Sequence, residues 1–210
     1  MTDFNYKIET DLIPKINNIK NIKILELGVQ KGRSTLEFLK ICKKNNGKLF
    51  SVDIDDCSSV SNDINWKFIH SRDDNFSLIK NLIPNVINVI FIDTIHESKH
   101  VEKLIYGYYD QLDVGGYMFI DDISHLPYLK GSERDSFYCE INNSETLEKI
   151  LEIYKNNVTN FNLNISYISS GLAIIQKKTV HKLIKPNTLY SRKSSLKNFL
   201  RKPWKILRKD

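Results

Sequence analysis

The chain has few cysteines and no long hydrophobic run. Its three cysteines, Cys42, Cys57 and Cys139, are an odd number without metal-site spacing, which favours reduced thiols in a cytosolic protein. No apolar stretch approaches the roughly 20 residues that a membrane-spanning helix needs. Residues 1–12 are polar and acidic and lack the apolar segment of a secretion signal, so we expect a cytoplasmic location.

A basic surface is also missing from most of the chain, although 31 Lys and Arg outnumber 25 Asp and Glu. Residues 179–210 hold ten of the basic residues and one acid, which leaves 21 basic and 24 acidic residues before them. The body therefore has no general nucleic-acid-binding signature. Its length and hydrophobic content suffice for one core, so we predict a domain over residues 1–178 and a basic tail over residues 179–210.

Only eight glycines occur, and two of them mark one predicted strand-to-helix turn. Residues 23–35 read KILELGVQKGRST: an apolar run and Glu26, then Gly28 and Gly32 in a G-x-x-x-G spacing, then the start of a helix. Glycine permits a tight turn and lets a ligand approach the main chain, while a helix N-terminus offers free N–H groups. The turn predicts a ligand-binding loop, and an ordinary turn without a ligand is the alternative.

Strands and helices alternate along the rest of the body. Strands are predicted over residues 22–29, 48–54, 66–70, 87–92 and 117–120, with a closing hairpin over 165–168 and 172–177. Helices are predicted over residues 6–16, 34–45, 76–82, 97–112 and 145–156. This pattern predicts an α/β fold with a Rossmann-like, doubly wound, mostly parallel seven-stranded sheet. Residues 125–144 show no clear period and are expected to form a lid or binding loop.

Acidic residues stand at or just after the end of each of the first five predicted strands: Glu26, Asp53, Asp73 with Asp74, Asp93, and Asp121 with Asp122. Parallel strands end on one rim, and ligands bind beyond that rim. Converging carboxylates repel one another unless they are protonated or bind a cation, and a divalent ion such as Mg²⁺ resolves the repulsion. Asp53 as a loop cap and Asp121 and Asp122 as plain loop acids are the alternatives.

Four motifs, taken in order and spacing, resemble the class I methyltransferases that use S-adenosylmethionine. They are E-L-G-x-x-x-G-R-S-T, V-D, F-I-D-x-x-H and G-G-Y-x-x-x-D-D, and the resemblance covers residues 21–178. The branch it is most similar to is the metal-dependent O-methyltransferases of sugars and small molecules. The resemblance implies methyl transfer from S-adenosylmethionine to a hydroxyl of a sugar, a glycan precursor or another small molecule.

The resemblance also implies roles for individual residues. The methionine part of the cofactor would contact Glu26, Gly28, Gln30, Gly32 and Ser34, while Asp53 would hold the ribose, and Arg72 and Asp73 the adenine. Asp93, Asp121 and Asp122 match metal ligands, and Asp93 also counts among the catalytic and cofactor-binding residues. His96 matches the general base, which would remove a proton from a hydroxyl that the metal acidifies. Thr94 and Ile95 depart from the glycine and aspartate of many relatives, and Arg72 is atypical for an adenine site.

Several alternatives to this reading stay open. The alternative role for His96 is to cap the helix that follows it. A metal-independent methyltransferase of the same fold, or a non-catalytic cofactor-binding scaffold protein in polysaccharide assembly, is the alternative function. A nicotinamide dehydrogenase is disfavoured, because the turn is G-x-x-x-G instead of G-x-G-x-x-G.

The basic tail has an apolar stripe, formed by Leu196, Phe199, Leu200, Trp204 and Leu207. A stripe of this kind among Lys and Arg predicts peripheral contact with the inner face of a membrane. A solvated basic tail is the alternative. The other expected partner is the small-molecule or glycan acceptor, with no nucleic acid, and the sequence leaves the oligomeric state open.

Overall fold

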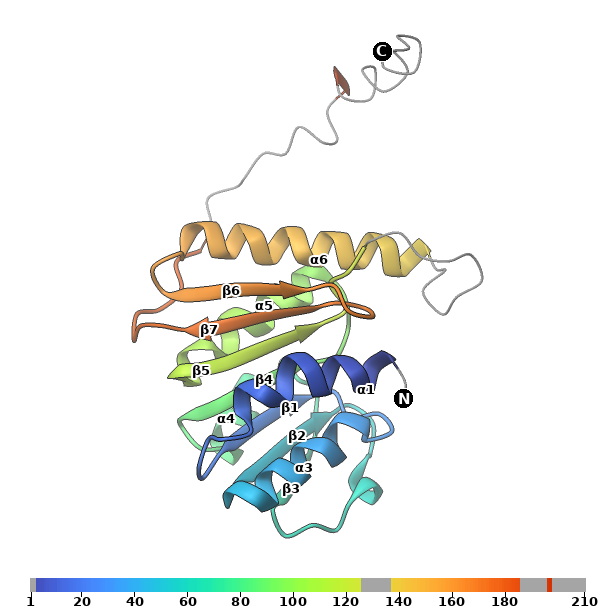
Figure 1. The fold of residues 1–210 in the computed structure, drawn as a ribbon, viewed down its shortest axis with the longest axis vertical. Coiled ribbons are helices and arrows are strands. Elements are labelled where there is room, and N and C mark those ends of the chain that lie inside the picture. The colour runs from blue at the N-terminus through green and yellow to red at the C-terminus, as the bar shows by residue number, and fades with distance from the viewer. Residues whose placement is uncertain (1–2, 126–136, 186–195, 198–210) are drawn as a thin grey trace.

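A seven-stranded sheet runs through the centre of the protein (Figure 1). The computed structural model describes residues 3–125, 137–185 and 196–197. The strand order is β3-β2-β1-β4-β5-β7-β6, with β7 antiparallel to both of its neighbours and the other neighbouring strands parallel. The strands are β1 Lys23–Leu27, β2 Lys48–Asp53, β3 Trp66–His70, β4 Ile87–Ile92, β5 Leu112–Asp121, β6 Phe161–Ser166 and β7 Leu172–Lys177. The predicted fold class, including the closing antiparallel pair, is confirmed.

Helices cover both faces of this sheet (Figure 1). One face carries the N-terminal helical segment, which consists of α1 Asp3–Lys7, the π-helical turn η1 Ile8–Leu12 and α2 Ile13–Ile16, together with α3 Arg33–Asn45. The other face carries α4 Phe76–Leu82, α5 Ser98–Tyr108 and α6 Phe137–Asn156. Two short 3₁₀ turns, η2 Ser58–Val60 and η3 Tyr109–Gln111, complete the described elements.

The alternation of side chains along the central strand explains the two layers. In β4, Val89 and Phe91 join the apolar cluster under α3, whereas Ile90 and Ile92 join the cluster under α5 and α6. Phe91 meets Phe38 of α3 edge-on, with ring centroids 5.4 Å apart. A strand buried on both faces must be apolar throughout, which is why this segment reads as an unbroken hydrophobic run.

The sequence pattern misplaces the boundary between α5 and β5. The predicted helix 97–112 ends at Tyr108, and β5 begins at Leu112, so Gly115 and Gly116 lie inside a strand and do not cap a helix. A Cβ at Gly116 would lie 2.7 Å from the Asn88 carbonyl oxygen. The glycine is therefore needed for the close approach of β5 to β4 at a register shift between the two strands.

The predicted loop over residues 125–144 is shorter than expected, because α6 begins at Phe137 instead of residue 145. Residues 126–136 lie outside the described part of the chain. Most of the basic tail, including four of the five residues of its apolar stripe, also lies outside it. No helix among the described residues is long and apolar enough to cross a bilayer.

The chain stays attached to the body for several residues beyond β7. The Asn157 side chain accepts a hydrogen bond from the Ile184 amide at 2.8 Å and donates one to the Ile184 carbonyl at 2.9 Å. The Tyr106 hydroxyl donates to the same carbonyl at 3.1 Å. Residues 178–184 are therefore held against α5 and α6, and a truncation that removes only the tail belongs after Lys185.

Candidate active site

The glycine loop between β1 and α3 forms one wall of the site. Gly28 and Gly32 have φ angles of 96° and 73°, which glycine adopts without the strain of a side chain. A Cβ at Gly28 would lie only 1.9 Å from the Asp93 carbonyl oxygen. The loop therefore packs backbone to backbone against the end of β4, and this contact places the ends of β1 and β4 side by side.

Glu26 supports this loop from below and does not line the cavity. Its fully buried carboxylate accepts hydrogen bonds from the hydroxyls of Ser34 (2.6 Å), Thr35 (2.8 Å) and Ser51 (2.6 Å). Burial raises the pKa of Glu26 to about 7, against the lowering effect of the three hydroxyls. The residue was predicted to contact the cofactor, but in the structure it joins β1, β2 and the start of α3.

Asp53 joins the end of β2 to the glycine loop. One carboxylate oxygen accepts hydrogen bonds from the amides of Val29 at 2.7 Å and Gln30 at 3.0 Å, and the other accepts from the Asp55 amide at 2.9 Å. Burial alone would raise the pKa of Asp53, but these backbone hydrogen bonds outweigh it and lower the pKa below its ordinary value. Asp53 caps loop amides, as the alternative reading proposed, and its oxygens keep lone pairs for a ligand.

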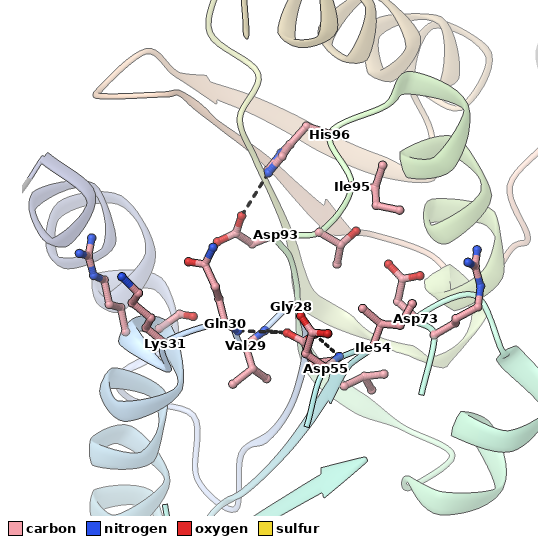
Figure 2. A pocket seen from close by; sticks show the side chains of 16 residues that line it. Gly28, Val29, Gln30, Lys31, Ile54, Asp55, Asp73, Asp93, Ile95 and His96 are labelled. Atoms are coloured by element: carbon pink, nitrogen blue, oxygen red, sulfur yellow. Dashed lines mark hydrogen bonds and ion pairs between the residues drawn. The ribbon is translucent and has the colours of Figure 1, made fainter. Parts of the chain in front are cut away.

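A cavity of about 400 Å³ opens between the glycine loop and the ends of β2 and β4 (Figure 2). Its size falls in the usual range for small-molecule sites. Two residues predicted to bind the cofactor, Glu26 and Gly32, are not part of its lining. The remaining predicted cofactor residues all line it: Gly28, Gln30, Ser34, Asp53, Arg72, Asp73 and Asp93.

Two apolar residues of the cavity wall were not predicted to contact the cofactor. Ile54 follows β2 and is 60% exposed, and Ile95 follows β4 and is 51% exposed. Large exposed aliphatic side chains on a cavity wall offer flat apolar surface to a ring system. Their sequence positions could have identified them as cavity residues, since each follows a strand-end acid by one or two residues.

The predicted adenine residues have partners within the protein. Arg72 forms an ion pair with Asp74, with its Nε 3.0 Å from the carboxylate. Asp73 lies 2.8 Å from Nε2 of His100 on α5. Both His100 and Asp73 are largely buried, with side-chain exposures of 11% and 12%. The His100 contact fixes Asp73 on the cavity wall, and no local sequence pattern links the two positions.

His96 lies beside two of the predicted metal ligands. Its Nε2 is 3.3 Å from the Asp122 carboxylate and 3.7 Å from the Asp93 carboxylate, and the Asp93 contact is visible in Figure 2. Burial, and then the charges of Asp121 and Asp122, raise the pKa of Asp93 above its ordinary value. Glu97, not His96, is the N-cap of α5, and no side-chain hydrogen bond caps that helix. The imidazole is therefore directed to the carboxylates and not to the helix end.

Asp121, the third predicted metal ligand, pairs with a lysine of the protein. Asp121 is buried and forms an ion pair with Lys7, whereas Asp122 takes a left-handed backbone conformation with φ of 56° and contacts His96. The adjacent residues Asp121 and Asp122 therefore contact different partners, Lys7 and His96. Within residues 3–125, 137–185 and 196–197, no group of three or more His, Cys, Asp or Glu is placed to hold a metal ion. The predicted metal set does not fit this geometry, because Asp121 already has a buried cation.

Comparison with known proteins agrees with this architecture. Residues 25–123 match the sequence profile of a family described as a methyltransferase domain. No curated protein sequence matches the chain. Solved structures match it at low identity: a methyltransferase of Podospora anserina with bound S-adenosylhomocysteine is 15% identical, with a TM-score of 0.61 over 75% of this chain and 72% of that protein.

Two further structures share the fold. The MycE methyltransferase of the mycinamycin pathway, in complex with Mg and S-adenosylhomocysteine, is 17% identical with a TM-score of 0.61 over 89% of this chain. The match spans only 55% of MycE, so this chain corresponds to about half of that protein. A Staphylococcus aureus protein described as a caffeoyl-CoA O-methyltransferase is 19% identical, with a TM-score of 0.62 over 84% of each chain. The chain therefore carries a match to a methyltransferase domain over residues 25–123 and shares the fold of these solved methyltransferases.

Proposed function

We propose that the protein transfers a methyl group from S-adenosylmethionine to a hydroxyl of a sugar, a glycan precursor or another small molecule. The observation that carries this proposal is the position of His96. Its imidazole is one-third exposed, lines the cavity, and lies against two carboxylates. An imidazole that lines a ligand cavity can serve as a general base.

The cofactor half of the cavity suits the parts of S-adenosylmethionine. The Asp53 carboxylate has free lone pairs for the two ribose hydroxyls, and Ile54 and Ile95 offer apolar walls for the adenine ring. Gly28 lines the same cavity, where its backbone would face the methionine part. These contacts would place the methyl-bearing sulfur toward Asp93 and His96.

In this proposal His96 acts as the general base. Its imidazole accepts the proton of the acceptor hydroxyl as the oxygen forms its bond to the methyl carbon and the carbon–sulfur bond breaks. The electron pair of that bond stays on sulfur, so the sulfonium becomes the neutral thioether of S-adenosylhomocysteine. Asp93 and Asp122 stabilise the imidazolium that results, and the protein otherwise contributes orientation.

Binding and turnover together test the proposal. Titration calorimetry should show binding of S-adenosylhomocysteine and no binding of NAD, because the glycine loop lacks the dinucleotide pattern. Incubation with S-adenosylmethionine and a panel of sugars, nucleotide sugars and phenols, followed by mass spectrometry, should show methylated product for one hydroxyl class. Binding without turnover on any class would favour the scaffold alternative, and absence of binding would remove the methyltransferase proposal.

A further inference from the structure

A buried lysine lies beneath the rim that carries the predicted metal ligands. The Lys7 side chain is fully buried, and its ammonium forms an ion pair with Asp121, whose side chain is only 3% exposed. It also donates hydrogen bonds to the Ser170 hydroxyl at 2.7 Å and to the Gly171 carbonyl at 3.4 Å. An ammonium has three N–H donors, and these three acceptors match them. The charge is therefore both paired and hydrogen-bonded, as a buried cation requires.

The local backbone explains how a lysine on the first helix reaches this position. Lys7 ends α1 and directly precedes the π-helical turn η1. A π turn widens the helix locally, and such turns are frequent at functional sites. Here Lys7 and its neighbour Ile8 are both buried, in line with Leu12. The Asp11 carboxylate accepts a hydrogen bond from the Ser166 hydroxyl at 2.5 Å and fixes the same segment to β6.

A divalent ion and this ammonium compete for the same carboxylate. Mg²⁺ needs oxygen ligands that are free to turn toward it, and a carboxylate is the protein ligand it takes most often. An ion on the Asp121 oxygen that faces Lys7 would have to displace Lys7, which would leave a second positive charge buried a few ångströms away. The Asp121 oxygen nearest Lys7 also accepts hydrogen bonds from the Asp122 amide at 2.7 Å and from Ser170 at 3.2 Å.

We propose that Lys7 is the resident cation of this rim, so that methyl transfer by this protein needs no divalent metal. Lys7 acts as a positioning residue: it neutralises Asp121 and leaves Asp93 and Asp122 to orient His96. The inference rests on the proposed function for its catalytic meaning. The ion pair itself is tested without turnover, so its failure is distinguishable from failure of the methyltransferase proposal.

The first experiment measures ion binding by thermal unfolding of the full chain with excess EDTA, MgCl₂ or MnCl₂. The melting temperature of the unmodified protein should be the same in all three, and so should its calorimetric affinity for S-adenosylhomocysteine. An ion site filled at one hundred times its dissociation constant would raise the melting temperature by roughly 5–10 °C. Such a rise, lost in the Asp121→Asn variant, would overturn the proposal.

The second experiment tests the charge pair itself. Lys7→Met should lower the melting temperature by about 6–20 °C, because it leaves Asp121 buried and unpaired. The double variant Lys7→Met with Asp121→Asn should recover much of this loss, because neither charge remains. Lys15→Met, at an exposed lysine of the same helical segment, is the matched control and should change little. A Lys7→Met variant as stable as this control would show that the pair is not formed.

Discussion

The two sides of the candidate active site, the proposed cofactor side and the proposed acceptor side, are held together by different kinds of contact. On the cofactor side, around the ends of β1 and β2, the contacts are made by the backbone: Asp53 binds three amides, and Gly28 packs against the end of β4. On the acceptor side, around the ends of β4 and β5, the contacts join charged side chains, with His96 between two carboxylates and Lys7 against a third.

This difference predicts how each side responds to change. Backbone contacts depend on chain conformation, so the cofactor side should be sensitive to a single added Cβ. Side-chain contacts depend on residue identity, so the acceptor side can change its chemistry while the fold stays the same. One fold can carry many different functional sites, which agrees with a constant half and an adjustable half.

The largest expected effect comes from the acceptor side. His96→Ala should lower turnover by about 10²–10⁴-fold, the usual contribution of one acid–base group. Affinity for S-adenosylhomocysteine should stay within a small factor of the unmodified protein, since the cofactor side is untouched. The exposed His181→Ala is the control for loss of an imidazole. A fall in melting temperature in place of a fall in turnover would assign His96 a structural role.

Alanine substitutions at two glycines, Gly28 and Gly115, test the cofactor side. Gly28→Ala should destabilise the fold by roughly 2–5 kcal/mol, because its φ of 96° is strained for alanine and its Cβ would overlap the Asp93 carbonyl. Gly115→Ala should cost only about 1–2 kcal/mol, because its φ of 85° is similarly strained but no atom of the described residues lies within 4 Å of the added Cβ. Urea unfolding measures both values, and equal losses would show that the close approach to β4 does not matter.

The pH dependence of stability should report on Glu26. Its pKa is raised from 4.5 to about 7 in the folded protein, so between these values the folded state holds a proton that the unfolded state has lost. The free energy of unfolding should therefore fall as pH rises from 4.5 to 7, by on the order of 3 kcal/mol. Urea unfolding across this window should show a clearly smaller fall in Glu26→Gln than in the unmodified protein. The exposed Glu9→Gln should keep the full fall.

Cofactor affinity should depend on Asp53. Asp53→Ala removes the acceptor proposed for the ribose and also releases three loop amides, so S-adenosylhomocysteine should bind about 10–150-fold more weakly, which corresponds to roughly 1.5–3 kcal/mol. Asp56→Ala, three residues further along the same loop, should bind normally. Calorimetry compares the two variants, and matching affinities would exclude Asp53 from cofactor binding.

The smallest expected effect concerns the basic tail, which we propose to hold the protein at a membrane surface. Each basic residue near an anionic surface contributes about 1 kcal/mol, so the full-length chain should co-sediment with anionic liposomes and dissociate in high salt. A chain that ends after Lys185 should stay in the supernatant and still bind S-adenosylhomocysteine. If neutral liposomes bind the full-length chain equally well, charge is not the cause.

The cofactor side could be predicted from the sequence, because it is built from short motifs and from one pattern that recurs at each strand end. The G-x-x-x-G turn, the strand-end acids and the apolar run of β4 each leave a mark within about ten residues, and they sufficed for the fold and most of the cavity lining. Glu26 was placed correctly at the end of β1, but its burial depends on Ser51 of the next strand and on the α3 hydroxyls. Local sequence does not reveal that burial.

The acceptor side could be predicted only in part. The positions of Asp93, His96, Asp121 and Asp122 follow from the strand ends, but the partner of Asp121 is Lys7, which is 114 residues away in the sequence. The helical pattern of residues 6–16 did not predict that Lys7 is buried. The π-helical turn that follows Lys7 cannot be recognised from the sequence. The carboxylates at the rim predicted a bound cation. In the structure that cation is Lys7, which comes from the first helix of the chain.

The long separation of Lys7 from its partners also has a consequence during synthesis. Lys7 leaves the ribosome early, whereas Ser170 and Gly171, which accept its hydrogen bonds, follow 163 and 164 residues later. At roughly 5–20 residues per second, the N-terminal helix waits about 8–30 seconds before its charge can be buried. During translation the first segment of the chain therefore has to stay exposed, and its docking on the finished sheet would be a late step of folding on the ribosome.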